Sequence, residues 1–273
     1  MKCVYGHDIQ YNLNDDNIRD IVALWFVKPK RVEELIGVPI ERWDVSSVTN
    51  MSYLFSQRKE FNADISRWDV SNVTSMEAMF LDAHIFNQPI GCWNTSRVTT
   101  MVAMFHSAFE FNQPIGGWDV SNVTSMERMF VATDDFNQNL SEWKTGNVTD
   151  MSEMFCEAQS FNQPVDMWDT SKVCTMEGMF WNADMFNQPV QTMVERAGDG
   201  CKLYSMVDGG ISYLYPVGFL PCDRFLPPRT EPFKLWLEFM GAYLDNNNSC
   251  PMPMDFFHDS ICKSILMFCY FAK

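Results

Sequence analysis

The chain has 273 residues, and 47% of them are hydrophobic, so it has enough apolar material for a core and is not disordered as a whole. The 35 acidic and 20 basic side chains give a formal charge of −15, and no cluster of basic residues interrupts this surplus. This balance argues against binding to nucleic acid or to an anionic membrane surface, because both repel an acidic protein.

The N-terminal region, residues 1–42, predicts a helical cap. Residues 14–26 begin with Asn14 as a helix cap, place acidic residues in the first turn and align Ile18, Ile21, Val22 and Trp25 on one face. Polar residues occur too early at the N-terminus for a signal peptide, so we expect a chain that the usual route does not export.

Residues 43–192 form six units of 25 residues with no insertion or deletion, each starting at a tryptophan. Counted from this tryptophan as position 0, Val recurs at plus 5, Met at plus 8, Phe at plus 12 and plus 18, and Asn at plus 19. We expect the tryptophan and asparagine columns to form the structural core of the repeat: Trp43, Trp68, Trp93, Trp118, Trp143, Trp168, Asn62, Asn87, Asn112, Asn137, Asn162 and Asn187.

Apolar residues at plus 8, 11, 12 and 15 follow the spacing of one helical face, so each unit is predicted to contain a short helix. Small polar residues at plus 7 are suited to capping it. The segment that leads into the next tryptophan is rich in β-branched and aromatic residues, which favours a short extended strand followed by a turn.

Units this small cannot bury an apolar face alone, so they are expected to stack. The predicted fold is α/β: a leucine-rich-repeat-like solenoid of six 25-residue units, each with a short parallel strand and a short helix. Because strands pair more closely than helices, the stack is expected to curve toward its strands. The Asn residues at plus 19 should bond the backbone of the adjacent unit in a ladder.

After residue 192 the period is lost, and residues 193–273 are predicted to be irregular and then helical, with helices over 230–244 and 255–271. We expect this region to cap the last unit or to dock onto a partner. Its longest apolar run, residues 265–272, is far shorter than the ~20 residues that span a bilayer, so no transmembrane segment is predicted.

The motifs W-D-[VT]-S-x-V-T-x-M-x-x-[ML]-F and F-N-Q-P-I resemble the BspA-like leucine-rich-repeat surface protein family, also described as mycoplasma-type lipoprotein-associated repeats. The resemblance covers residues 43–192. It implies a leucine-rich-repeat-like solenoid, often uncharacterised, with bacterial members presented as adhesins or surface lipoproteins and similar arrays in protists and large DNA viruses. It implies no catalytic residues.

Groups that carry chemistry are sparse. Nine cysteines without a CxxC motif suggest reduced thiols rather than a disulfide framework or a zinc site. Asp at plus 1 is interrupted by Asn94 and Lys144, so turns closed by the aspartate side chain explain it better than a calcium ladder. The tightest cluster, Asp255, His258, Asp259 and Cys262, lacks a third ligand or an oxyanion donor. We therefore expect neither an enzyme nor a cofactor or metal site.

The units differ most at plus 13 to plus 17, which is where a repeat frame varies for binding. The candidate partner-binding residues are Ile85, His106, Phe109, Asp134 and Trp181. The sequence favours a non-enzymatic scaffold, intracellular or virion-associated, that binds one or more proteins through a curved acidic surface. A structural component of a viral particle or coat is one alternative, and a cell-surface adhesin, which requires export, is another.

Overall fold

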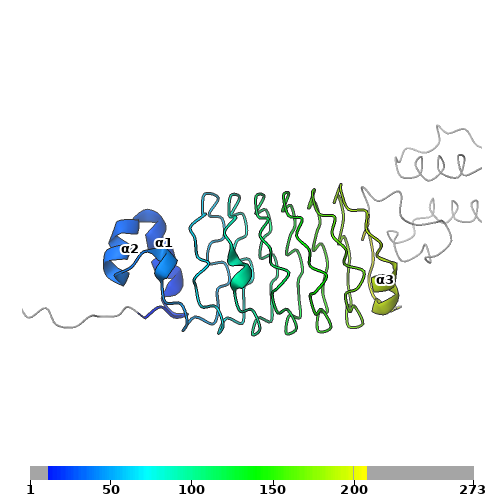
Figure 1. The fold of residues 1–273 in the computed structure, drawn as a ribbon, viewed down its shortest axis with the longest axis horizontal. Coiled ribbons are helices and arrows are strands. Elements are labelled where there is room, and N and C mark those ends of the chain that lie inside the picture. Colours follow the sequence, from blue (N-terminus) through cyan, green and yellow to red (C-terminus); the bar gives the residue numbers. More distant parts are fainter. Residues whose placement is uncertain (1–11, 199, 208–273) are drawn as a thin grey trace, which may run out of the picture. The chain divides into compact units, whose positions relative to one another are not determined.

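The computed structural model describes residues 12–198 and 200–207. Within these ranges lie the N-terminal cap, the six repeat units and the start of the region that follows them (Figure 1). The helices predicted over 230–244 and 255–271 lie outside the described residues, as does the cluster from Asp255 to Cys262.

Two helices form the N-terminal cap. Helix α1 (Ile18–Val27) buries Ile18, Ile21 and Val22, as its apolar face predicts, whereas α2 (Pro29–Ile36) was not predicted. Helix α1 begins later than expected because Asn14 and the residue after it bond to the first repeat unit instead. The proline at the start of α2 suits a first helical turn, where no backbone N–H is required.

The six units, which we call coils 1 to 6, lie side by side, and each bonds to the next with a constant offset (Figure 1). The predicted helix in each coil is wrong, because residues 43–190 contain one 3₁₀ helix, η2 (Ile90–Cys92), and no α-helix. A second 3₁₀ helix, η1 (Ile40–Arg42), comes just before coil 1.

Backbone direction explains the missing helices. The residues at plus 10 and plus 14 of every coil have left-handed φ angles between 49° and 61°. The N–H groups at plus 8, 10, 12 and 14 therefore point out of their own coil and donate to carbonyls of the next one, as Ala103 donates to Glu127 at 2.8 Å and Phe105 to Met129 at 2.9 Å. An α-helix needs those donors for the carbonyls four residues back.

The predicted strand is also wrong. Parallel pairing between coils is limited to isolated bridges at plus 7, as between Thr100 and Ser125, and one further bridge joins Ser47 of coil 1 to Asn14 of the cap. The described coils therefore contain no strand and no sheet. The leucine-rich-repeat-like α/β solenoid is thereby overturned. The argument for curvature also fails, because it placed narrow strands opposite wide helices and neither element occurs in these coils.

Three aromatic columns fill the interior. The six tryptophans at position 0 are 1–5% exposed, and Trp93 and Trp118 stack with centroids 6.4 Å apart. Phenylalanines at plus 12 stack at 5.4–5.7 Å from coil to coil, and those at plus 18 at 5.7–6.0 Å. Each tryptophan from Trp68 onward donates its Nε1–H to the backbone carbonyl 28 residues earlier in the chain, as Trp118 does to Ile90 at 3.2 Å.

The asparagines at plus 19 form a ladder. The Oδ1 of Asn112 accepts hydrogen bonds from the backbone N–H of Asn137 at 3.1 Å and from Nε2 of Gln138 at 2.8 Å, and Asn62, Asn87, Asn137 and Asn162 accept the same pair of bonds. All six asparagines at plus 19 are half-buried or exposed.

The stack continues past residue 192. Helix α3 (Gln191–Ala197) places Met193 fully buried where the next tryptophan is due. Lys202 then forms a bridge with Thr175, and Leu203 and Met206 enter the core. The expected loss of period at 192 therefore corresponds to the insertion of a helix, after which coil-to-coil bonding resumes.

Candidate functional site

The residues predicted to bind a partner lie in neighbouring columns, on what we call the side surface. It comprises plus 9 to plus 17 of coils 1 to 6, which are residues 52–60, 77–85, 102–110, 127–135, 152–160 and 177–185. His106 and Trp181 are at plus 13, Phe109 and Asp134 at plus 16, and Ile85 at plus 17. Trp181 is exposed and the other four are half-buried.

The plus 13 column is continuous from coil to coil, because the N–H at plus 14 donates to the plus 13 carbonyl of the next coil. Between His106 and Trp181 it contains Val131 and Cys156, which are 7% and 5% exposed. Trp181 is 41% exposed, and Met185 in the same coil is 61% exposed. The exposed large hydrophobic side chains of the side surface are therefore Trp181 and Met185 at coil 6 and Tyr53 at coil 1, whose hydroxyl donates to Glu77 at 2.6 Å.

The plus 16 column contains His84, Phe109 and Asp134 on three adjacent coils. The rings of His84 and Phe109 are 4.5 Å apart, and the Phe109 carbonyl accepts the N–H of Asp135 at 3.0 Å. Partial burial, together with the carboxylates of Asp135 and Glu157, raises the pKa of Asp134. Phe109 is thus already packed against a neighbour, whereas Asp134 lies among like charges.

His106 faces a mixed group of charges. Burial lowers the pKa of its imidazole, and Asp82 and Arg128 act on it in opposite directions. Arg128 forms a bidentate pair with Glu153, its Nε and Nη2 lying 2.8 Å and 3.0 Å from the two carboxylate oxygens. This pair holds the pKa of Glu153 below its ordinary value and leaves Arg128 little free charge for a partner.

The polar residues that suggested chemistry serve local structure. The carboxylates of Asp44, Asp69, Asp119 and Asp169 accept the N–H of the serine two residues on, at 3.0–3.1 Å, which confirms the predicted turns. The side-chain and backbone hydrogen bonds from Ser71 lower the pKa of Asp69, and the other three aspartates follow the same pattern. Burial raises the pKa of the Cys156 thiol to about 12, so this thiol stays protonated.

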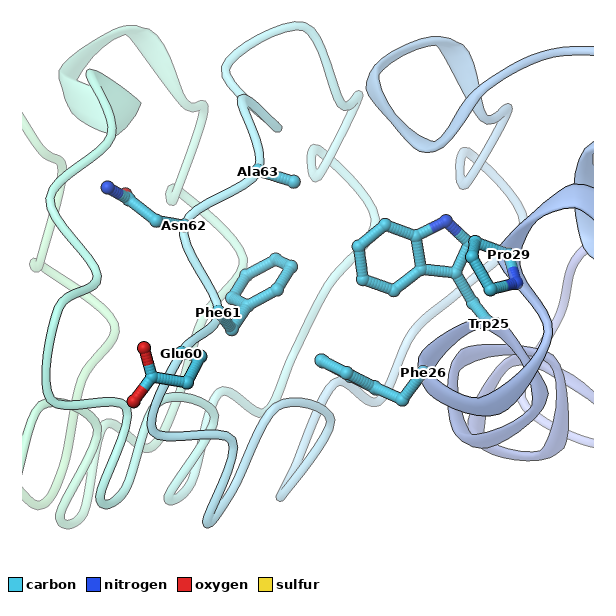
Figure 2. A pocket seen from close by; sticks show the side chains of 7 residues that line it. All are labelled: Trp25, Phe26, Pro29, Glu60, Phe61, Asn62 and Ala63. Atoms are coloured by element: carbon cyan, nitrogen blue, oxygen red, sulfur yellow. The ribbon is translucent and has the colours of Figure 1, made fainter.

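A pocket at the junction of the cap and coil 1 was missed at the sequence level. It has a volume of about 400 Å³ and is lined by Trp25, Phe26, Pro29, Glu60, Phe61, Asn62 and Ala63. Figure 2 shows Trp25 and Phe26 reaching from α1 toward Phe61, with the side chains of Glu60 and Asn62 directed away from the two cap aromatics. One signal was present in the sequence: Ala63 replaces the glutamine found at plus 20 in every other coil.

Neither a metal site nor a membrane span is present within residues 12–198 and 200–207. No group of three His, Cys, Asp or Glu side chains in this part of the chain is arranged to hold a metal ion. None of its helices has the length and apolar character needed to cross a bilayer.

Comparison with known proteins gives one match. The family described as "Mycoplasma protein of unknown function, DUF285" matches residues 30–134 and 110–199. No curated protein and no solved structure matches the chain. The match agrees with the mycoplasma-type part of the resemblance seen in the sequence, but it does not show the BspA-like part. Because the matched ranges together cover more than half of the chain, the protein belongs to the DUF285 family of mycoplasma-type repeat proteins.

Proposed function

We propose that the protein is a non-enzymatic repeat scaffold that binds a basic partner protein through its side surface, with Trp181 as the apolar anchor. The proposal rests above all on Trp181, which is 41% exposed in the last complete coil while the tryptophans at position 0 are 1–5% exposed. Large aromatic side chains dominate the binding energy of many protein interfaces.

The charge of the side surface sets the character of the partner. In coils 2 to 6 the surface carries one basic residue, Arg128, which is paired with Glu153. Its acidic residues are Glu77, Asp82, Glu110, Glu127, Asp134, Asp135, Glu153, Glu157, Glu177 and Asp184. A field of one sign attracts a partner of the opposite sign and speeds their association.

The coil-to-coil bonds supply a rigid frame for this surface. Main-chain donors at plus 10, plus 12 and plus 14 are bonded to the next coil in each of coils 1 to 5, whatever side chain the position carries. The side chains at plus 13 to plus 17 can therefore differ between coils without altering the backbone. A frame fixed in this way lowers the ordering cost of binding.

A non-enzymatic role is supported by the polar groups of the repeat, which are engaged in structural hydrogen bonds or stay protonated. The aspartates at plus 1 are held in turns by serine, and the asparagines at plus 19 bond the next coil. The thiol of Cys156 is protonated, and burial likewise raises the pKa of Cys201 to about 11. These particular groups are therefore not free for hydrolytic or thiol chemistry.

The test is partner capture by the full chain, with mass spectrometry, comparing wild type with Trp181→Ala. Met167→Ala is the matched control, because Met167 is also a large exposed apolar residue, at 73%, but lies outside the side surface. A true partner is lost with Trp181→Ala, kept with Met167→Ala, and released by added salt, which screens the acidic residues. Equal capture by both variants at unchanged melting temperature would refute the proposal.

A further inference from the structure

Coil 1 contains two backbone N–H groups whose equivalents in every later coil donate to the preceding coil. In coils 2 to 6 the N–H at plus 17 donates to the plus 16 carbonyl of the preceding coil, and the N–H at plus 19 donates to the preceding asparagine side chain. In coil 1 these donors belong to Glu60 and Asn62, and neither has an acceptor among the described residues. The cap helices therefore leave this part of the coil edge unpaired.

The pocket lies beside these donors (Figure 2). Phe61 continues the aromatic column on one side, where Phe86 stacks parallel to it at 5.7 Å. On its other side Trp25 and Phe26 approach edge-on, with interplanar angles of 84° and 66°. The Nε1–H of Trp25 is buried and has no acceptor within the described ranges. The site thus combines an apolar space with three unpaired donors.

Basic residues adjoin the pocket lining in the chain, although the protein as a whole is acidic and the lining itself includes Glu60. Pro29 lies between Lys28 and Lys30 in the chain, and the guanidinium of Arg58 is 4.5 Å from the centre of the Phe26 ring. Lys59, which precedes Glu60, is exposed. Donors and basic side chains together favour a ligand that supplies acceptors and negative charge.

We propose that this edge binds an extended acidic segment of a partner protein, which adds part of a coil to coil 1 and inserts an aromatic side chain into the pocket. Pairing of an extended segment with an unpaired backbone edge is a common mode of peptide recognition. This site shares residues 58–60 with the coil 1 end of the side surface, but the proposal does not depend on the function proposed above, whose anchor Trp181 is in coil 6.

The repeat itself shows what such a segment looks like. In coil 4 the carbonyl of Asp134 accepts from Ser160 at 3.1 Å, and Oδ1 of Asn137 accepts from Asn162 at 3.0 Å. A segment with an acidic residue, an aromatic residue and an asparagine in this order offers the matching acceptors to Glu60 and Asn62. Ala63 leaves open the space that a plus 20 glutamine side chain would fill.

The probe is the peptide Ala-Thr-Asp-Asp-Phe-Asn-Gln-Asn, which copies residues 132–139, with fluorescein on its N-terminal amine and an amidated C-terminus. Fluorescence anisotropy with the full chain should show saturable binding, weakened at least about tenfold when alanine replaces the phenylalanine of the peptide. In a two-dimensional amide NMR spectrum the peptide should shift the Glu60 and Asn62 resonances and leave those of Ser160 and Asn162 in place. Absence of binding, or equal binding of both peptides, overturns the proposal.

Protein variants locate the site. Ala63→Leu fills the pocket and Lys59→Glu reverses a charge beside it, so each should weaken binding about fivefold or more at unchanged melting temperature. Lys144→Glu makes the same charge change at an exposed position four coils away and should bind as wild type does. Binding that survives Ala63→Leu contradicts the pocket.

Two other occupants give distinct results. If removal of residues 1–11 raises the affinity for the peptide at least about tenfold, the chain's own N-terminus is the occupant and the proposal is overturned. If sedimentation shows self-association that Ala63→Leu abolishes, the occupant is a second copy, and the assignment to a different protein is likewise wrong. A monomer with unchanged affinity after the deletion supports the proposal.

Discussion

The carboxylate of Asp15 accepts the hydrogen bonds of Thr49, whereas a backbone carbonyl of the preceding coil accepts those of the later threonines at plus 6. Its Oδ1 accepts the Thr49 N–H at 2.8 Å and its Oδ2 accepts the Thr49 hydroxyl at 2.6 Å. In coil 2 the N–H and hydroxyl of Thr74 both donate to the Thr49 carbonyl. One side chain of the cap therefore completes the hydrogen bonds that a missing coil would supply.

Asp15→Ala should lower the free energy of unfolding by about 1–2 kcal/mol, a value reduced from that of a buried charged bond because Asp15 is exposed. Burial alone would raise the pKa of Asp15, but the bonds from Thr49 and Asn50 and the charge of Arg19 outweigh it and lower that pKa. The stabilisation is present above the unfolded-state pKa of about 3.9 and is lost as pH falls through the lower folded-state value.

Urea unfolding at neutral pH and at about pH 2.5 measures this difference between wild type and Asp15→Ala, which should shrink at the lower pH. Asp16→Ala serves as the control, because the Asp16 side chain is exposed and no bond to coil 1 is made by it. A difference that persists unchanged in acid would show that the charge of Asp15 is not the stabilising group.

Trp118→Phe and Trp43→Phe separate the tryptophan hydrogen bond from tryptophan packing. Both rings are 3% exposed, but Nε1 of Trp118 donates to the Ile90 carbonyl, whereas Nε1 of Trp43 has no acceptor in the part of the chain that the structure describes. Trp118→Phe should therefore cost about 1 kcal/mol more than Trp43→Phe in chemical denaturation. Trp118→Ala should cost about 3–5 kcal/mol. Equal losses for the two phenylalanine variants would contradict the hydrogen-bonded column.

The asparagine ladder can be tested at its middle and at its end. Asn112→Ala leaves the N–H of Asn137 without its acceptor and removes one of the two acceptors of Gln138 Nε2, which keeps the Asn112 carbonyl at 3.1 Å, so it should cost about 1–3 kcal/mol. In Asn187 the Oδ1 accepts, among the described residues, only from its neighbour Gln188, at 3.4 Å. Asn187→Ala should therefore change the melting temperature little, and a loss as large as that of Asn112→Ala would mean that the ladder bonds are not the cause.

Ala103→Gly distinguishes the observed turns from the helix that the apolar spacing predicts. In a helix this change costs about 1 kcal/mol. Ala103 has φ of 51°, a left-handed conformation that glycine adopts without strain, so the change should be neutral or stabilising. Ala108→Gly in the same coil, at a fully buried position without positive φ, should be destabilising. Thermal unfolding of the two variants gives the answer, and a clear loss for Ala103→Gly would favour the helix.

The apolar pattern was a good guide to burial and a poor guide to backbone conformation. Met101, Met104, Phe105 and Ala108 are all fully buried, as one helical face requires. Four-residue turns with a left-handed residue at the third position bring the same positions inward, as the bond from Met104 N–H to the Met101 carbonyl around Ala103 shows. The spacing of side chains therefore does not distinguish the two backbones.

The two candidate sites also differ in whether the sequence alone reveals them. The side surface follows from comparing the units with one another, because the positions that vary are those that the stack does not need. The pocket at coil 1 arises where a helix of the cap meets the first coil, so Trp25 and Phe61, 36 residues apart in the chain, had to be placed in space before it was visible.

The sequence by itself determined the length of the repeat, the residues that fill its interior, the apolar face of α1 and the aspartate turns, because each of these depends on which side chains recur at which interval. Only the tertiary structure decided that the coils contain neither α-helix nor strand, and that two N–H donors at the edge of coil 1 have no acceptor among the residues that the structure describes. The reason is that every residue except proline carries the same backbone N–H and C=O groups. Whether these groups bond within a coil or to its neighbour depends on the distance between coils, which no single repeat unit records.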